Sequence, residues 1–254
     1  MDASEGTERT LVVLRYSPWS ERAKWALDHH ALRYRLVQHE PFIGEPRLRR
    51  LVGGRTRPTV PVLVLPEALL TDSWDIALYA DRTGSAARLV PEAEAGAIAE
   101  IRALADEAMN FGRVLVTRAL LGSNAALDEL SPRFVPALLR PLLRPVTRYG
   151  TAWFGRKYAL DLDDLETPRQ RVVSALERFR ERLAGKPYLL GSFTYADILL
   201  CSLLQGIRPP EHRAIRLGPA ARAAWTQPEL AHRFEDLLAW RDRLYRDVRP
   251  APVA

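Results

Sequence analysis

The sequence predicts an α/β domain followed by an all-α domain, a fold of the class α/β plus all-α. Residues 10–84 contain short apolar runs that alternate with amphipathic patterns, in the order strand, helix, strand, helix, hairpin, helix. After Gly84 no strand pattern is apparent, and Ala, Leu, Arg and Glu recur at helical spacing. This change predicts two domains, residues 1–84 and 92–254, joined by a linker over residues 85–91.

The first strand and helix are indicated by a buried run and a helix-start signal. TLVVLRY over residues 10–16 is continuously apolar, which suits a strand buried on both faces. Ser17 is a good N-cap and Pro18 is a favoured first helical residue, so a helix should begin there. Residues 34–38 are predicted to form a second strand, which completes a βαβ unit.

The rest of the first domain is predicted to contain a short helix, a hairpin and a longer helix. The Arg-rich residues 45–52 form the short helix. Residues 60–65 and 68–70 are close enough in sequence to pair as a hairpin. A helix over residues 73–82 follows, and Gly84 ends it.

The second domain is predicted to be helical, with one irregular segment. Residues 92–121 fit one long helix. A second helix carries a stripe of apolar residues at helical spacing: Val172, Val173, Leu176, Phe179 and Leu183. Prolines at 132, 136, 141 and 145 prevent residues 131–160 from being a regular helix throughout, so a kinked helix or a chain of turns is expected.

Composition indicates a globular protein of the cytoplasm. The chain has 254 residues, of which 47% are hydrophobic, enough for two modest domains. The N-terminus lacks the basic start and apolar run of a secretory signal, and the longest apolar stretch, 198–204, is too short to span a bilayer. The single cysteine, Cys201, allows no internal disulfide and is expected to be a buried, inert thiol.

The formal net charge of +6 is concentrated in one segment. Residues 131–160 contain five arginines, one lysine and no acid, namely Arg133, Arg140, Arg144, Arg148, Arg156 and Lys157. We expect them to form one continuous basic patch. No aromatic-rich basic sheet or zinc-knuckle spacing accompanies this charge, so a nucleic-acid reader is disfavoured. Three interpretations of this segment remain: a solvated basic face, a lid over an acidic substrate, or a weak contact with an anionic membrane.

Three local sequences, in this order, resemble the cytosolic glutathione transferase superfamily. SPWSERAKWAL, residues 17–27, is similar to the family's turn from strand to helix, in which Ser or Cys precedes a helix that carries an Arg. TVPVL, residues 59–63, resembles its Val-Pro step with a cis proline. TDSWDIALYADR, residues 71–82, resembles the helix start that binds the γ-glutamyl group. The resemblance implies a thioredoxin-like N-terminal domain and a helical-bundle C-terminal domain; it suggests a serine-type, bacterial-like member without fixing the class.

A fourth sequence, GSFTYADILL over residues 191–200, resembles the capping motif of the family's C-terminal domain. Thr194 and Asp197 occupy its two positions. In such a capping box each side chain accepts a hydrogen bond from a backbone N–H of the other residue. These two residues are therefore expected to have a structural role.

The resemblance assigns catalysis to Ser17. A free thiol has a pKa of about 8.5, so only a small fraction is the nucleophilic thiolate at neutral pH. A hydroxyl donor at the positive end of a helix stabilises that anion. Ser17 could also be only an N-cap, and Ser20 and Tyr16 are the alternative hydroxyls. Family members that catalyse thiol exchange carry Cys at this place, whereas this chain has Ser17. Thiol exchange is therefore disfavoured for this chain.

The remaining glutathione-binding residues also follow from the resemblance. Trp19 would lie beside the thiol, and the backbone at Val60 and Pro61 would pair with the peptide. Asp72 and Ser73 would hold the γ-glutamyl ammonium and carboxylate groups, although both are also common helix caps.

Three arginines are candidates for the glycine carboxylate of glutathione: Arg47, Arg55 and Arg57. Met109, Phe111 and Arg113, on the long helix of the second domain, are the expected substrate-pocket residues. His29 and His30, where the first helix ends, are expected to be solvated.

The sequence therefore supports two hypotheses. In the first, a transferase activates the glutathione thiolate for attack on a small electrophilic, hydrophobic molecule. The co-substrate is glutathione, no metal is required, and the resemblance implies a homodimer. In the second, the same fold is a non-catalytic binder of hydrophobic ligands, of an anionic membrane or of a protein partner.

Overall fold

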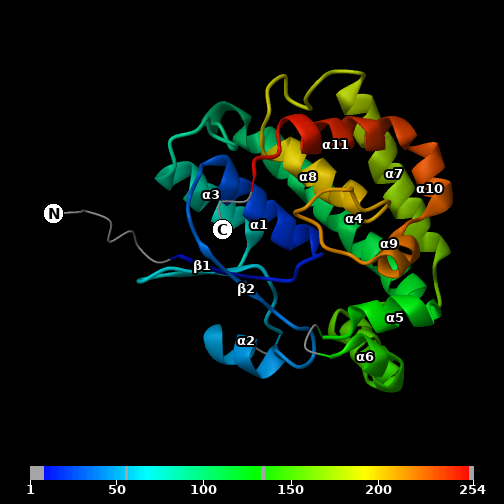
Figure 1. Cartoon of the computed structure of the whole chain (residues 1–254). Coiled ribbons are helices and arrows are strands. Elements are labelled where there is room, and N and C mark those ends of the chain that lie inside the picture. Colours follow the sequence, from blue (N-terminus) through cyan, green and yellow to red (C-terminus); the bar gives the residue numbers. More distant parts are fainter. Residues whose placement is uncertain (1–8, 55–56, 133–134, 252–254) are drawn as a thin grey trace. The chain divides into compact units, whose positions relative to one another are not determined.

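The computed structural model describes residues 9–54, 57–132 and 135–251. The described residues fall into two compact units, one comprising residues 9–91 with 249–251 and the other residues 92–248 (Figure 1). The first unit has a four-stranded sheet and the second is helical, so the predicted fold class is confirmed. The last described residues group with the first unit, although they follow the last helix of the second.

A mixed sheet forms the centre of the first unit, in the order β2-β1-β3-β4. β1 and β2 are parallel, whereas β3 is antiparallel to both β1 and β4. The strands are β1 (Thr10–Val13), β2 (Arg35–Gln38), β3 (Val62–Val64) and β4 (Leu69–Leu70). All four residues of β1 are buried, as its continuously apolar sequence predicts for a central strand.

Helices cover both faces of this sheet (Figure 1). The helix α2 (Glu45–Leu51) lies on one face, where Leu48 packs with Val12 and Val62. The helices α1 (Pro18–His29) and α3 (Ser73–Thr83) pack against each other on the opposite face. This arrangement is the thioredoxin-like one that the sequence indicates.

The register of the sheet brings three chain segments to one edge. Val12 of β1 is paired with Val62, so the carboxyl end of β1 lies beside the amino end of β3. Leu63 is paired with Leu70, so the carboxyl end of β4 lies at the same edge. The residues that follow β1 and β4, and those that precede β3, therefore gather there.

The second unit is built around the long helix α4 (Ala95–Gly122), which follows the 3₁₀ turn η1 (Glu92–Glu94). α4 packs against α6, α7, α8 and α9. The other elements are α5 (Asn124–Leu130), η2 (Ala137–Leu139), α6 (Arg140–Lys157), α7 (Glu166–Leu183), α8 (Tyr195–Gln205), α9 (Pro219–Trp225), α10 (Pro228–Arg233) and α11 (Glu235–Asp247). α8 is buried along its whole length and includes Cys201, as predicted. Among the described residues, no helix is both long and apolar enough to cross a membrane.

A capping box begins α8. Both of its hydrogen bonds are present, one from the Asp197 backbone N–H to the Thr194 side chain and one from the Thr194 N–H to the Asp197 carboxylate, at 2.8 Å. The Asp197 carboxylate also accepts from the Leu189 N–H at 2.9 Å. Burial raises the pKa of Asp197 to about 6, although these hydrogen bonds oppose the shift. The box therefore ties the preceding loop to the buried helix.

The Pro-rich segment resolves into turns followed by a helix. Before η2, residues 131, 132, 135 and 136 belong to no helix or strand, and α6 then runs for 18 residues. Pro141 lies in the first turn, where an N–H would have no helical partner, whereas Pro145 lies inside the helix. One interior proline removes one hydrogen bond and does not end the helix.

The expectation that both histidines at the end of α1 are solvated is wrong. His30 is buried, and its Nε2 lies 2.8 Å from an Asp81 carboxylate oxygen; His29 is only partly exposed and contacts the Ala87 carbonyl. A Cβ atom at Gly84 would lie 2.3 Å from the His30 side chain. Gly84 ends α3 at φ −88°, so this position needs glycine for the close approach of His30 and not for a left-handed turn.

Candidate functional site

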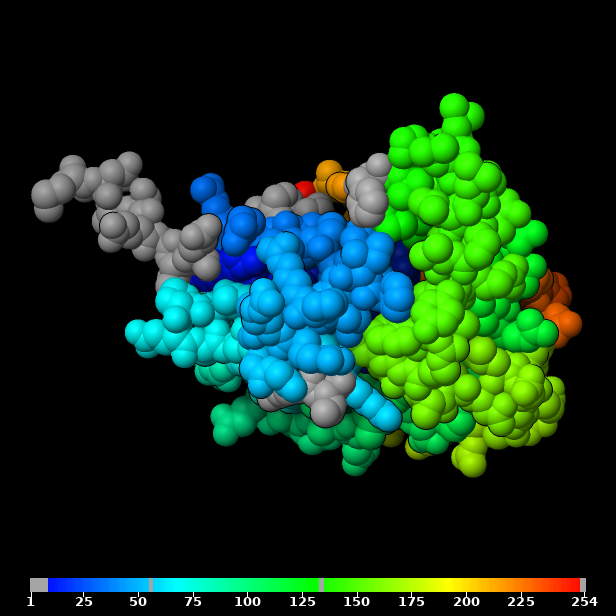
Figure 2. All heavy atoms as spheres, turned by 90° about the horizontal axis from the view of Figure 1, so that it is seen from below, coloured from blue at the N-terminus to red at the C-terminus, as the bar shows by residue number. Residues whose placement is uncertain are grey.

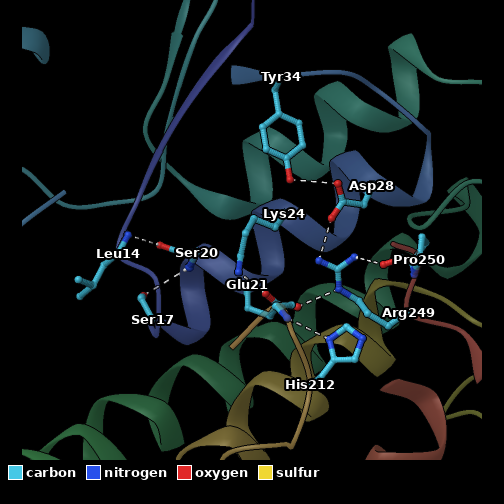
Figure 3. A network of polar contacts seen from close by, with 11 residues as sticks. Leu14, Ser17, Ser20, Glu21, Lys24, Asp28, Tyr34, His212, Arg249 and Pro250 are labelled. Atoms are coloured by element: carbon cyan, nitrogen blue, oxygen red, sulfur yellow. Dashed lines mark hydrogen bonds and ion pairs between the residues drawn. The ribbon is translucent and has the colours of Figure 1, made fainter. Parts of the chain in front are cut away.

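Ser17 lies at the edge where β1 ends, as the N-cap of α1. Its backbone is extended, with φ −74° and ψ 128°, and its Oγ accepts from the Ser20 N–H at 3.4 Å (Figure 3). The side chain is half-buried. Pro18 follows as the first helical residue, which explains why the chain turns into a helix at this point. At 3.4 Å between Ser20 N and Ser17 Oγ, this N-cap hydrogen bond is weak.

Ser20, the first alternative hydroxyl, has a different role. It is buried, and its Oγ accepts from the Leu14 N–H at 3.2 Å (Figure 3). Leu14 directly follows β1, so this bond holds the end of the strand against the first turn of α1. The geometry assigns Ser20 to the support of the turn that carries Ser17.

Tyr16, the second alternative, has a pKa raised to about 12 by burial. The Arg15 guanidinium opposes this shift and the Glu40 carboxylate adds to it. The phenol is therefore neutral at physiological pH and can only donate a hydrogen bond from its uncharged form. An ionised tyrosine is excluded at this position.

The Val60–Pro61 peptide bond is cis, as the resemblance implies. The paired register of β3 and β1 begins at Val62, so Val60 lies outside the ladder. Trp19 is half-buried on α1, with the buried Arg22 guanidinium 6.0 Å from its ring centroid. These residues come from the end of the sheet and the first turn of α1.

Asp72 is the N-cap of α3. Its carboxylate accepts from the Trp74 N–H at 2.8 Å, and its backbone is extended. Ser73 is the buried first residue of the helix. The capping role is therefore present, and it is compatible with a ligand role because a helix N-terminus also attracts a ligand carboxylate.

The candidates for the glycine carboxylate are not gathered by the structure. Arg47 is exposed on α2 and Arg57 is exposed in the loop before β3. Arg55 lies outside the described residues. No contact distinguishes Arg47 from Arg57.

The three expected pocket residues lie on α4 but point in different directions. Met109 is buried, and its sulfur accepts from the Ser202 hydroxyl of α8 at 3.5 Å. Arg113 lies with its guanidinium 4.0 Å from the Tyr158 ring centroid, and burial lowers its pKa. Phe111 faces the Arg171 guanidinium of α7 at 6.0 Å. At about 100° per residue, Phe111 lies on nearly the opposite side of α4 from Met109 and Arg113, which are four positions apart and share a face, so the three do not line one surface.

An ionic network that sequence analysis missed lies on the face of α1 away from the sheet edge. The Arg249 guanidinium contacts the carboxylates of Glu21 and Asp28, each at 2.8 Å (Figure 3). Lys24 lies 2.6 Å from Glu21, and the Tyr34 hydroxyl donates to Asp28 at 3.0 Å. All five side chains are buried. The signal in the sequence was the recurrence of charged residues at positions 21, 24 and 28, which share one face of α1.

Electrostatics within this network favour the charged forms of Glu21 and Arg249 and the neutral form of Tyr34. Burial alone would raise the pKa of Glu21, but the Lys24 and Arg249 cations hold it below its usual value. Burial and the Asp28 carboxylate raise the pKa of the Tyr34 phenol. The two carboxylates raise the pKa of Arg249 against the effect of burial. The network therefore fixes the chain terminus to the helix that presents Ser17.

Within the part of the chain that the structure describes, no three His, Cys, Asp or Glu side chains are grouped so that they could hold a metal ion. The ordered polar groups at the sheet edge are instead hydroxyls, a carboxylate and helix N-termini. Such groups suit a zwitterionic organic ligand.

Comparison with known proteins agrees with this fold. Residues 11–87 match the family model for the glutathione S-transferase N-terminal domain. No curated protein matches the chain by sequence. Sequence similarity therefore assigns residues 11–87 to the glutathione S-transferase N-terminal domain family.

Solved structures extend the similarity of fold to almost the whole chain. Glutathione transferase GSTFuA3 from Phanerochaete chrysosporium is 18% identical with a TM-score of 0.64, over 94% of this chain and 96% of that one. A glutathione S-transferase from Methylobacillus flagellatus, solved with glutathione bound, is 18% identical with a TM-score of 0.59, over 96% and 100%. CsGST63524 of Ceriporiopsis subvermispora, in complex with glutathione, is 16% identical with a TM-score of 0.62, over 97% and 100%.

Proposed function

We propose that this chain is a glutathione transferase-like enzyme in which Ser17 stabilises the glutathione thiolate for attack on a small, apolar electrophile. The observation that carries the proposal is the sheet register, which brings the segments after β1, before β3 and after β4 to one edge. These segments contain Ser17, the cis Val60–Pro61 bond and the Asp72–Ser73 helix start. Each supplies the kind of group that one part of a thiol peptide needs.

The chemistry expected of each group follows from its charge and hydrogen-bonding capacity. The Ser17 hydroxyl donates to the sulfur anion while the N-terminus of α1 contributes a partial positive charge. The Val60 backbone pairs with the cysteinyl segment of the peptide. The Asp72 carboxylate attracts the γ-glutamyl ammonium group, and the N-terminus of α3 at Ser73 attracts its carboxylate.

Lowering the pKa of the bound thiol is the catalytic step that this arrangement performs. The thiol proton passes to solvent, and the thiolate sulfur forms a C–S bond with the electrophilic carbon, which at the same time gives up a leaving group with its bonding electron pair. We include in the proposal a homodimer, which rests on the family resemblance, and a cytoplasmic location, which rests on the composition and the single cysteine.

The test measures glutathione binding by calorimetry and the pKa of the bound thiol by its thiolate absorbance, in wild type and Ser17→Ala. We expect Ser17→Ala to raise the thiol pKa and to lower turnover with a model electrophile by about 10- to 100-fold, the equivalent of one charged hydrogen bond. Affinity should change little because the other binding groups remain.

Ser20→Ala is the matched control, because it removes a hydroxyl three positions away on the same helix turn. It should leave the thiol pKa unchanged. Normal turnover in Ser17→Ala with a loss in Ser20→Ala would transfer the role to Ser20. A wild type that neither binds glutathione nor shifts its thiol pKa would leave the non-catalytic binder as the function.

A further inference from the structure

The helix α6 exposes a row of large apolar side chains. Leu138, in the preceding η2 turn, is 91% exposed and Leu142 is 74% exposed. The row also includes Leu139, Leu143, Val146 and Tyr149. Positions 142, 146 and 149 have the spacing of one helical face, and η2 continues it toward the N-terminus. We call these six residues the α6 apolar face.

The opposite side of α6 holds the helix to its own unit. Arg144 forms two hydrogen bonds with the Asp128 carboxylate of α5, at 2.6 and 2.8 Å. The Thr147 and Ser131 hydroxyls lie 3.0 Å apart, and Gly155 is buried near Leu162. Polar contacts therefore face inward and leucines face outward, the reverse of an ordinary surface helix. In Figure 2 the α5 and α6 residues, in green and yellow-green, form a broad continuous surface.

The expected single basic patch is therefore not the principal feature of this segment. Three of the arginines make polar contacts within their own unit. Arg140 donates to the Val135 carbonyl, Arg144 to the Asp128 carboxylate, and Arg148 to the side chain of Asn124 at the start of α5. Arg156 and Lys157 lie at the other end of the helix. Arg133 lies outside the described residues.

The end of the apolar face has aromatic rings beside cations. The Arg156 guanidinium lies 5.2 Å from the Tyr149 ring centroid, and the Lys157 ammonium lies 5.4 Å from that of Trp153. Long basic side chains whose stems cover apolar surface, together with Tyr and Trp, are typical of helices at the surface of a bilayer.

We propose that the α6 apolar face inserts into the headgroup region of an anionic lipid surface, with α6 parallel to the membrane. The leucines supply apolar area, and Arg156 and Lys157, at the carboxyl end of the helix, are attracted to anionic headgroups. Residues 131–160 carry no acid, so two copies that met through this face would repel each other. Charge complementarity therefore favours lipid over a second copy of the chain.

The experiment uses flotation of the full-length chain with vesicles of phosphatidylcholine, alone or mixed with phosphatidylserine. The test variant is the double substitution Leu138→Ser and Leu142→Ser. We expect wild type to float with the mixed vesicles, and the double variant to bind at least about tenfold more weakly, because each leucine loses its burial in the interface. Arg156→Gln with Lys157→Gln should weaken binding to the mixed vesicles by about fivefold per charge and bring it closer to that of the neutral vesicles.

Ile43→Ser is the matched control, since Ile43 is an exposed aliphatic residue of the other unit. It should bind vesicles as wild type does. Equal binding by the Leu138→Ser, Leu142→Ser variant would overturn the proposal, as would an absence of wild-type binding at low salt. If wild type does not bind vesicles but self-associates, and the leucine substitutions abolish that self-association, the α6 apolar face instead binds a second copy of the chain.

Discussion

The helices α1 and α6 both reverse the usual distribution of polar and apolar residues, in opposite ways. α1 buries Glu21, Lys24 and Asp28, whereas α6 exposes Leu142 and its apolar neighbours. The charges of α1 find their partner within the chain, in Arg249. The apolar face of α6 remains exposed in the structure of the single chain.

This difference separates a structural feature from an interaction surface. Burying a charge is costly unless it is paired, so the α1 network must be complete for the first unit to be stable. Exposing a leucine costs the fold little, so selection for stability cannot explain the α6 face. The first feature should respond strongly to substitution in unfolding experiments, and the second should not.

The largest expected effect is that of Arg249→Met on the first unit. This substitution leaves Asp28 buried without its cation and leaves Glu21 with Lys24 alone, which should cost about 3–5 kcal/mol. Urea unfolding followed by Trp fluorescence measures it. Arg246→Met is the matched control, because Arg246 is exposed on α11 and pairs only with Asp247 among the contacts described; it should change the free energy of unfolding by less than about 0.5 kcal/mol.

A combined substitution distinguishes lost charge pairing from lost packing. Adding Asp28→Asn to Arg249→Met removes the carboxylate left without its cation, whereas Glu21 keeps Lys24, and should recover at least half of the lost free energy. If this double variant is no more stable than Arg249→Met alone, the network acts through shape and not through charge.

The pH dependence of the Arg249→Met effect gives the next largest change. The pKa of Glu21 is lowered from 4.5 in the folded state, so its stabilising contribution is present above pH 4.5 and is lost as pH falls through the lower folded value. Without Arg249, only Lys24 opposes the effect of burial, so the pKa of Glu21 should rise relative to wild type and protonation should cost the folded state less. The difference in unfolding free energy between wild type and Arg249→Met should shrink as pH is lowered from neutral to about 4. A difference independent of pH would contradict the ionic origin.

The fold was predictable because its signals are local. Ser17 and Pro18 mark the start of α1, and Asp72 marks that of α3, since capping depends only on neighbouring backbone groups. The strands are shorter than predicted. Leu14, Arg15 and Tyr16 leave the sheet to form the turn, and Val60 and Pro61 precede the ladder that begins at Val62.

The remaining features depend on contacts distant in sequence. Arg249 and Glu21 are 228 positions apart, and neither residue type signals the other. Charge counting located the basic segment but could not tell that Arg144 points inward to Asp128 and Leu142 outward. The segments of the candidate site were predictable because each motif lies next to the end of a predicted strand, and these strand ends meet at one edge of the sheet. The directions of the side chains on α4 were not predictable in this way.

A smaller effect separates the two serines at the start of α1. Ser20→Ala leaves the buried Leu14 N–H without its acceptor, which should cost about 1–3 kcal/mol. Ser17→Ala removes a cap at 3.4 Å on a half-buried residue and should cost about 0.5 kcal/mol, the low end for N-caps. Thermal or urea unfolding gives the ranking. A larger loss in Ser17→Ala would make the N-cap its principal role.

The smallest effect is expected for Leu142→Ser in α6. Leu142 is 74% exposed, so the substitution removes little buried area, and Ser has a slightly lower helix propensity than Leu. The free energy of unfolding should change by less than about 0.5 kcal/mol. Leu200→Ser in the buried helix α8 is the comparison variant, since it places a hydroxyl where a leucine is fully buried. It should cost about 2–5 kcal/mol, the range of large-to-small core substitutions. If Leu142→Ser destabilises the chain as Leu200→Ser does, the α6 face is covered within the molecule in solution, and the contrast between α1 and α6 disappears.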